Sequence, residues 1–108
     1  MNLKIKKNKI DDKGYLINFK DWNKKLALKL ANSESIEMNE NHWEIVYCIR
    51  EFYNKYNISP NVHMLVKFLF KKYGYKKGNS RYIFNLFPKG PIKQALKIAG
   101  LPKPSKCL

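Results

Sequence analysis

The strongest constraint on the fold is an apolar stripe that recurs with a helical period between residues 40 and 56. Asn39, a good N-cap residue, stands directly before it. A helix with one broad apolar face must bury that face against other elements. The pattern therefore predicts a long core helix, and it favours core packing over a platform for stacking bases. The stripe consists of Trp43, Val46, Tyr47, Ile49, Phe52, Tyr53 and Tyr56.

One further helix is predicted before the long one and one after it. Asp21 is a good N-cap for a helix over residues 22–32. Ser59, followed by proline, predicts the start of a helix over residues 60–73, which Gly74 ends. Helical spacing indicates the buried positions, which are Trp22, Leu26, Leu30, Met64, Leu65, Phe68 and Leu69.

Two shorter helices are predicted in the last third of the chain. Asn79 or Ser80 would cap the first, and Pro91 would open the second over residues 92–99, with Gly100 as its stop. The helix after Ser59 and the one after Asn79 are expected to form a helix-turn-helix-like pair. This geometry serves packing as often as it serves DNA reading.

The N-terminal segment has β-prone runs on both sides of a turn. Leu3-Lys4-Ile5 and Ile10 precede Asp11-Asp12-Lys13-Gly14, and Tyr15-Leu16-Ile17 follows. Such runs around a turn that ends in glycine predict a small β-hairpin over about residues 3–17.

A chain of 108 residues has the size of one domain with a modest core. We therefore expect a mostly α fold: a small helical domain with an N-terminal β-hairpin, a helix-turn-helix-like pair and an extended C-terminal arm. The body would span residues 1–99, and a flexible arm over residues 100–108 would carry Cys107.

The arm presents a thiol near positive charge. Pro102 and Pro104 exclude helix and favour an extended backbone. Lys103 and Lys106 would favour the thiolate of Cys107, although the lysine bias of the whole chain explains them equally well. Position alone leaves open whether the thiol is functional or incidental.

The net charge of +14 invites a nucleic-acid interpretation that the composition weakens. All of the 22 basic residues except Arg50 and Arg81 are lysine, whereas base reading and bidentate phosphate recognition favour arginine. Codons biased towards A and T explain the many Lys, Asn and Ile residues without a selected binding surface. A positive field that helps an encounter with an acidic or RNA-loaded partner remains reasonable.

Other site chemistry is absent from the sequence. His42 and His63 have no metal-ligand spacing with the cysteines, and Cys48 is expected to be an inert core thiol in the long helix. No glycine-rich phosphate loop occurs. We therefore expect no metal and no cofactor, and Cys107 is the only credible nucleophile.

The two cysteines form no disulfide framework, and no signal or membrane-spanning pattern appears, so a soluble, cytoplasmic protein is predicted.

Short motifs follow one another in order along almost the whole chain. The most specific is QALKIAGLPKPSKC over residues 94–107, which ends on a penultimate cysteine. With these motifs, the chain resembles the TusE/DsrC family of small sulfur carriers, related to the gamma subunit of dissimilatory sulfite reductase. The other matching motifs are Asp12-Lys13-Gly14-Tyr15-Leu16 with Trp22, His42-Trp43-Glu44, Arg50-Glu51-Phe52-Tyr53, Ile58-Ser59-Pro60, Leu65-Val66-Lys67, Gly78-Asn79-Ser80 and Leu86-Phe87-Pro88-Lys89-Gly90-Pro91.

The resemblance implies a helical fold with an N-terminal hairpin and a mobile arm, and a persulfide carried on Cys107. In the sulfite-reductase branch a second arm cysteine lies eleven residues before the penultimate one, where this chain has Leu96. The chain therefore looks like the sulfur-relay branch of the family. His63 stands where many relatives have Arg.

The resemblance also implies partners. They are an upstream TusBCD-like relay complex and a downstream MnmA-like tRNA 2-thiouridylase, which would thiolate the wobble uridine with tRNA bound to it. Cys107 would be the catalytic residue, and Pro102, Lys103, Pro104 and Lys106 would bind partners. No membrane partner is expected, and direct binding of nucleic acid is compatible with the charge but not required.

Three alternatives stay open at this point. A helix-turn-helix nucleic-acid binder would bind with a steep salt dependence that ignores Cys107. A partner subunit of a dissimilatory sulfite reductase is disfavoured by Leu96. A purely structural subunit would be indifferent to alkylation of its thiols.

Overall fold

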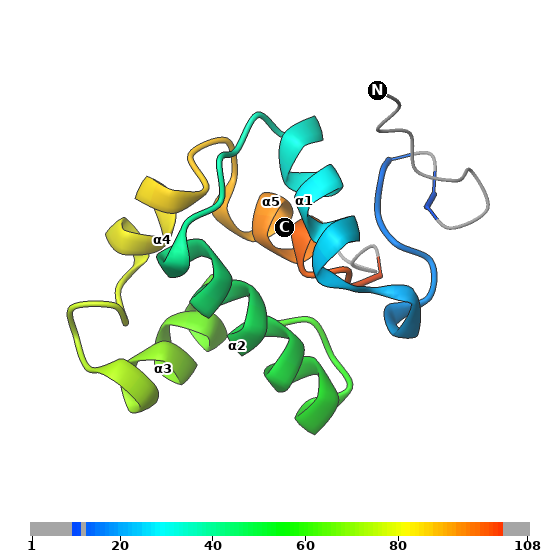
Figure 1. Cartoon of the computed structure of the whole chain (residues 1–108). Coiled ribbons are helices and arrows are strands. Elements are labelled where there is room, and N and C mark those ends of the chain that lie inside the picture. The colour runs from blue at the N-terminus through cyan, green and yellow to red at the C-terminus, as the bar shows by residue number, and fades with distance from the viewer. Residues whose placement is uncertain (1–9, 12, 103–108) are drawn as a thin grey trace.

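The last helix, α5 (Pro91–Ile98), lies at the centre of the molecule, with α1, α2 and α4 around it and α3 on the far side of α2 (Figure 1). The computed structural model describes residues 10, 11 and 13–102. Helix α5 contacts α1, α2 and α4, and α2 also contacts α3. Within the described residues the fold is a small domain of five α-helices, preceded by one 3-10 turn and without a sheet. In chain order the elements are η1 (the 3-10 turn, Phe19–Asp21), α1 (Lys24–Ser33), α2 (Glu40–Tyr56), α3 (Val62–Tyr73), α4 (Ser80–Leu86) and α5.

An asparagine side chain caps the N-terminus of each of the first four α-helices. Asn39 caps α2, as the sequence predicts, and of the two caps predicted for α4, Asn79 and Ser80, it is Asn79 that caps the helix. The predicted cap Asp21 is wrong, because the side chain of Asn23 accepts the N–H of Leu26 at 2.8 Å and so begins α1. The start predicted at Ser59 and Pro60 is also wrong. The side chain of Asn61 accepts the N–H of Met64 at 2.9 Å, so Asn61 is the cap and Val62 is the first residue of α3. In each case the asparagine nearest to the helix satisfies its free N–H groups.

The N-terminal β-hairpin predicted over residues 3–17 is not supported. Residues 3–9 lie outside the described residues, and in the described part a single antiparallel bridge joins Ile10 and Leu16 without forming a strand. The carboxylate of Asp11 accepts the N–H groups of Lys13 and Tyr15, each at 2.9 Å, and so closes the turn locally. Tyr15 and Leu16 are both buried. A strand would send consecutive side chains to opposite faces, so this burial fits a turn packed on helices and not a hairpin.

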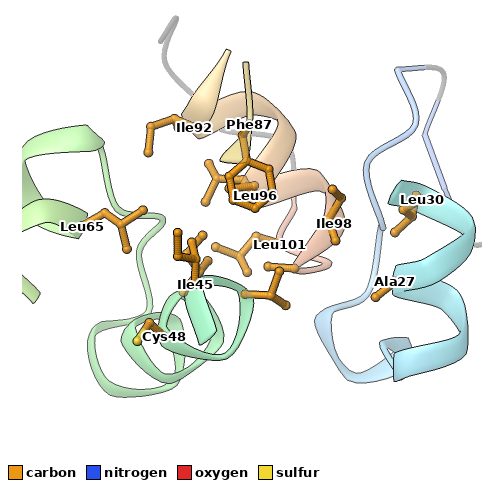
Figure 2. Packing of buried hydrophobic residues seen from close by; sticks show 14 of the residues in the cluster. Ala27, Leu30, Ile45, Cys48, Leu65, Phe87, Ile92, Leu96, Ile98 and Leu101 are labelled. Atoms are coloured by element: carbon orange, nitrogen blue, oxygen red, sulfur yellow. The ribbon is translucent and has the colours of Figure 1, made fainter. Parts of the chain in front are cut away.

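One cluster of buried hydrophobic residues joins the helices (Figure 2). Val46, Ile49 and Phe52 of the predicted stripe are buried, whereas Tyr47 and Tyr56 are exposed at its edges. Of the buried positions predicted in α1 and α3, Leu26, Leu30, Leu65 and Leu69 are buried, and Met64 is exposed. The two helices of the predicted helix-turn-helix-like pair, α3 and α4, make their main contacts with α2 and α5 respectively, and not with each other.

A polar contact fastens α1 to α5. Glu34 follows α1, and its carboxylate accepts the side-chain amide of Gln94 at 3.2 Å and pairs with the ammonium of Lys97 at 2.8 Å. The Gln94 side chain is buried, and its oxygen accepts the N–H of Lys89 at 3.1 Å. Both ends of this buried amide are therefore hydrogen-bonded, as a polar group in a core requires.

Among the described helices, none is long and apolar enough to cross a membrane.

Candidate functional site

The described structure reaches the base of the C-terminal arm but not its thiol. Cys107 and three of the predicted binding residues, Lys103, Pro104 and Lys106, lie outside the described residues. Pro102, the fourth, is the last described residue and is half-buried. The described part of the candidate site therefore consists of residues 98–102, where the chain leaves the body, and of the side chains that contact them.

The backbone after α5 closes the helix with a Schellman motif. The N–H of Gly100 donates to the carbonyl of Lys97, and the N–H of Leu101 donates to the carbonyl of Leu96, both at 3.1 Å. Gly100 has a φ of +76°, which the motif requires at this position. Leu101 and Leu96 are both 0 % exposed and accompany the motif as its apolar pair (Figure 2). The chain therefore stays within the body through residue 101 and reaches its surface at Pro102.

Two side chains from distant parts of the sequence bind the carbonyls that the helix end leaves free. The indole N–H of Trp22 donates to the carbonyl of Ile98 at 2.8 Å. The guanidinium of Arg50 donates from Nη1 to the carbonyl of Ala99 at 2.7 Å and from Nη2 to the carbonyl of Phe19 at 3.2 Å. Arg50 thereby links the end of α5 to the turn η1 near the start of the chain.

The rings of the same segment hold the guanidinium in place. Its central carbon lies 3.8 Å from the ring centroid of Phe19 and 4.3 Å from that of Trp22. Arginine forms such flat contacts with aromatic faces while its fork of N–H groups donates elsewhere. Burial lowers the pKa of Arg50 to about 10, so the side chain remains a cation at neutral pH. A cation is favourable here because the C-terminal end of a helix carries partial negative charge.

The other cysteine, Cys48, has none of the properties of a reactive thiol. Cys48 lies on α2 within the hydrophobic cluster and is 2 % exposed, which confirms the predicted core position. Desolvation by burial raises the pKa of its thiol above the ordinary value, so the reactive thiolate is disfavoured. This thiol fills space in the core.

The histidines provide no metal centre in the described part of the chain, where no group of three or more His, Cys, Asp and Glu side chains could hold an ion. His42 is buried and works as a helix cap: its Nδ1 accepts the N–H of Asn39 at 3.1 Å, and its Nε2 lies 2.9 Å from the carbonyl of Leu86. These contacts fit the neutral ring with its hydrogen on Nε2. His63 is exposed on α3.

Trp22 and Arg50 were not predicted from the sequence as residues that hold the base of the arm. Trp22 was expected on a helix face, and Arg50 entered only as a motif residue and as one of two arginines. A weak signal was present, since an arginine in a chain where lysine is the usual cation indicates a need for a planar, multidentate donor. Nothing in the sequence pairs it with Ala99, which lies 49 residues away.

Fold and site together define a small helical protein whose cysteine-bearing C-terminal segment starts from an anchored base. The family model for "DsrC like protein" matches residues 2–108. The chain is 58 % identical to sulfurtransferase TusE of Photorhabdus laumondii, and the match covers 91 % of this chain and 88 % of the relative. It is 54 % identical to a TusE homologue of Haemophilus influenzae, over 91 % of this chain and 90 % of the relative.

Solved structures agree with these matches. The structure of DsrC from Allochromatium vinosum superposes with a TM-score of 0.82 at 46 % identity, covering 92 % of this chain and 88 % of that one. The oxidised gamma subunit of dissimilatory sulfite reductase from Archaeoglobus fulgidus superposes with a TM-score of 0.79 at 39 % identity, covering 92 % and 90 %. The chain belongs to the TusE/DsrC family, and it is a sulfurtransferase with a sulfur-carrier role.

Proposed function

We propose that Cys107 is the residue that carries the sulfur, as a persulfide. The observation that carries this proposal is the burial of Cys48, because the chain has two cysteines and the other one is enclosed in the core with a raised pKa. The position of Cys107, six residues after the anchored Leu101, supports it further. A thiol on such a segment can enter the active site of a partner without any rearrangement of the helical body.

The chemistry is an exchange between sulfur atoms. The Cys107 thiolate attacks the outer sulfur of a donor persulfide, and the bond between the two donor sulfurs breaks. A new S–S bond forms on Cys107, the transferred sulfur keeps its hydrogen, and the donor leaves as a thiolate. No external oxidant or reductant is needed, because one persulfide is exchanged for another. Repetition of the step on an acceptor passes the sulfur on.

Leu96 favours a carrier with a single active cysteine. This residue occupies the position of the second arm cysteine in the sulfite-reductase branch, and here it is a fully buried member of the core cluster. Without a second thiol at this place, Cys107 has no partner for the intramolecular disulfide of that branch. The proposal therefore assigns the chain to sulfur relay and not to the redox cycle of a sulfite reductase.

The proposed route places the chain between two partners in the cytoplasm. The donor is a TusBCD-like relay complex, and the acceptor is an MnmA-like tRNA 2-thiouridylase that thiolates the wobble uridine. The names of the TusE relatives support this branch of the family. In the proposal Pro102, Lys103, Pro104 and Lys106 bind in the partner's cleft: the prolines limit the entropy lost on binding, and the lysines favour the thiolate.

Intact-mass spectrometry after incubation with the persulfide-loaded donor complex tests the proposal. The wild-type chain is expected to gain the mass of one sulfur atom, which a thiol reductant then removes. Cys107→Ser should abolish this gain and tRNA thiolation, whereas the matched variant Cys48→Ser should retain both. Sulfur uptake by Cys107→Ser, or full tRNA thiolation supported by it, would overturn the proposal.

A further inference from the structure

The backbone carbonyl groups at the C-terminal end of α5 all accept hydrogen bonds from the protein. The last carbonyls of a helix have no partner within the helix and commonly turn to water. Here five consecutive carbonyls, from Ala95 to Ala99, each accept a protein hydrogen bond. The donors are the N–H groups of Ala99 (2.9 Å), Leu101 (3.1 Å) and Gly100 (3.1 Å) for residues 95, 96 and 97, the indole of Trp22 for Ile98 (2.8 Å) and the guanidinium of Arg50 for Ala99 (2.7 Å).

The residues around these hydrogen bonds are closely packed. A Cβ added to Gly100 would lie 2.3 Å from Cδ1 of Trp22, so the indole fills the space beside the turn. The next residue, Leu101, is 0 % exposed. Trp22 is itself fixed by its hydrogen bond to Ile98 and by the guanidinium of Arg50 against its ring. The direction of the chain at Pro102 is therefore set by the body.

We propose that Trp22 and Arg50 are positioning residues for sulfur transfer: by holding Ile98 and Ala99 they set the direction in which the cysteine-bearing arm leaves the body. The inference rests on the proposed role of Cys107 and adds residues that lie far from the thiol in sequence. The inference also explains why residue 50 is an arginine and not a lysine. The guanidinium of Arg50 donates to two carbonyls while it stacks on two rings, and an ammonium group has no flat face for such stacking.

The length of the arm makes its direction matter. Cys107 follows Pro102 by five residues, which span at most about 17–18 Å when fully extended. The radius of gyration of the molecule is 13.1 Å, so an arm of this length serves one side of the body and cannot reach around it. A fixed exit therefore concentrates the thiol where a docked partner can receive it. Release of the base would spread the thiol over many positions and lower its effective concentration at the partner.

The chain offers matched substitutions for each positioning residue. Arg50→Lys keeps a cation but loses the fork and the flat stacking, and Trp22→Phe keeps an aromatic ring but loses the N–H. The second arginine and the second tryptophan provide the controls: Arg81 is exposed on α4, and Trp43 is half-buried on α2 beside Tyr47. Trp43 is joined to Trp22 only through Tyr47, whose ring centroid lies 5.9 Å from that of Trp22. Arg81→Lys and Trp43→Phe therefore change the same chemistry in side chains that bind neither the carbonyl of Ile98 nor that of Ala99.

Transfer kinetics separate positioning from chemistry. Sulfur uptake from inorganic polysulfide, a small donor that needs no docking, is expected to be unchanged in Arg50→Lys and Trp22→Phe. Uptake from the persulfide-loaded relay complex should fall by about tenfold in the ratio kcat/KM, with the loss mainly in kcat, because the docked complex holds the thiol less often in the reactive position. Arg81→Lys and Trp43→Phe should retain the wild-type rates with both donors.

A distance measurement tests the same inference without any activity. In a Cys48→Ala, Ser33→Cys background, spin labels on residue 33 at the end of α1 and on Cys107 report the distribution of distances between arm and body. The distribution is expected to broaden in Arg50→Lys and in Trp22→Phe, and to keep its width in the two controls.

Equal broadening in the controls, an unchanged width in Arg50→Lys and Trp22→Phe, or an equal loss with polysulfide and the relay complex would each overturn the positioning role. A wild-type chain that takes no sulfur from either donor would instead refute the role of Cys107, and the distance measurement would still decide whether Trp22 and Arg50 hold the arm.

Discussion

The indole of Trp22 occupies the space that a side chain at Gly100 would need, with Cδ1 only 2.3 Å from the Cβ that any other residue would carry there. The contact joins a residue near the start of the chain to the turn that ends the last helix. It explains how a segment close to the C-terminus, where chains are commonly loose, is kept in one conformation as far as Leu101.

Gly100→Ala is expected to lower the free energy of unfolding more than Gly74→Ala does. Both glycines have positive φ, +76° and +83°, so each alanine introduces backbone strain of about 1–3 kcal/mol. A Cβ at Gly74 would meet nothing within 4 Å, whereas the one at Gly100 would collide with Trp22. Urea unfolding followed by circular dichroism measures the difference.

A double-mutant cycle identifies the cause of this difference. In a Trp22→Ala background the collision is removed, so Gly100→Ala should cost only its backbone strain and therefore less than in the wild-type background. An equal cost of Gly100→Ala in both backgrounds would show that the indole does not restrict this position.

Leu101→Ala is expected to destabilise the fold by about 2–5 kcal/mol, as for other large-to-small changes in a core. Leu101 is 0 % exposed, although its place between glycine and proline near the C-terminus would suggest a surface position. Leu28→Ala on α1 is the matched control, since Leu28 is 49 % exposed and its truncation should change stability by less than about 0.5 kcal/mol. Similar small effects of both variants in urea unfolding would contradict the burial of Leu101.

Acid is expected to destabilise the fold through His42. Desolvation by burial lowers the pKa of this ring below the ordinary value of 6.5, against the opposing effect of the hydrogen bond to Leu86. In the window below pH 6.5 the unfolded chain therefore binds more protons than the folded one. The stability contributed by the neutral ring is complete above this window and is lost as the pH falls through it.

Urea unfolding at a series of pH values measures this effect. His42→Gln can still accept the N–H of Asn39 in the manner of a capping box, and it should flatten the decline between about pH 7 and pH 5. His63→Gln, at an exposed position on α3, should retain the wild-type slope. A slope that survives in His42→Gln would assign the acid sensitivity to another group.

Local signals predicted the elements well where one residue type decides the outcome. Asn39 begins α2, Tyr56 ends it, and Gly74 follows the end of α3, all as the sequence predicts. These boundaries depend on side-chain caps and on backbone conformation within a few residues of the helix end. The start of α1 was misplaced because Asp21 and Asn23 are both good caps, and only packing chooses between them.

The predicted N-terminal hairpin is not supported in its described part, residues 10, 11 and 13–17, for a related reason. The β-prone runs and the turn residues are present, but the side chain of Asp11 closes the turn, and Tyr15 and Leu16 are both drawn into the helical core. Burial against helices outweighs the alternation that a two-stranded hairpin needs, since such a hairpin is only marginally stable by itself.

The sequence by itself determined a helical domain, the caps of α2 and α4, most of the helix ends, a core cysteine in α2 and a penultimate cysteine at the end of a proline-containing segment. Only the tertiary structure decided how that segment is attached. The hydrogen bonds from Trp22 to Ile98 and from Arg50 to Ala99 join residues 76 and 49 positions apart. No periodicity or cap rule reaches across such separations, because these contacts exist only after α2 and α5 pack together and bring a half-buried guanidinium to the free carbonyls of a helix end.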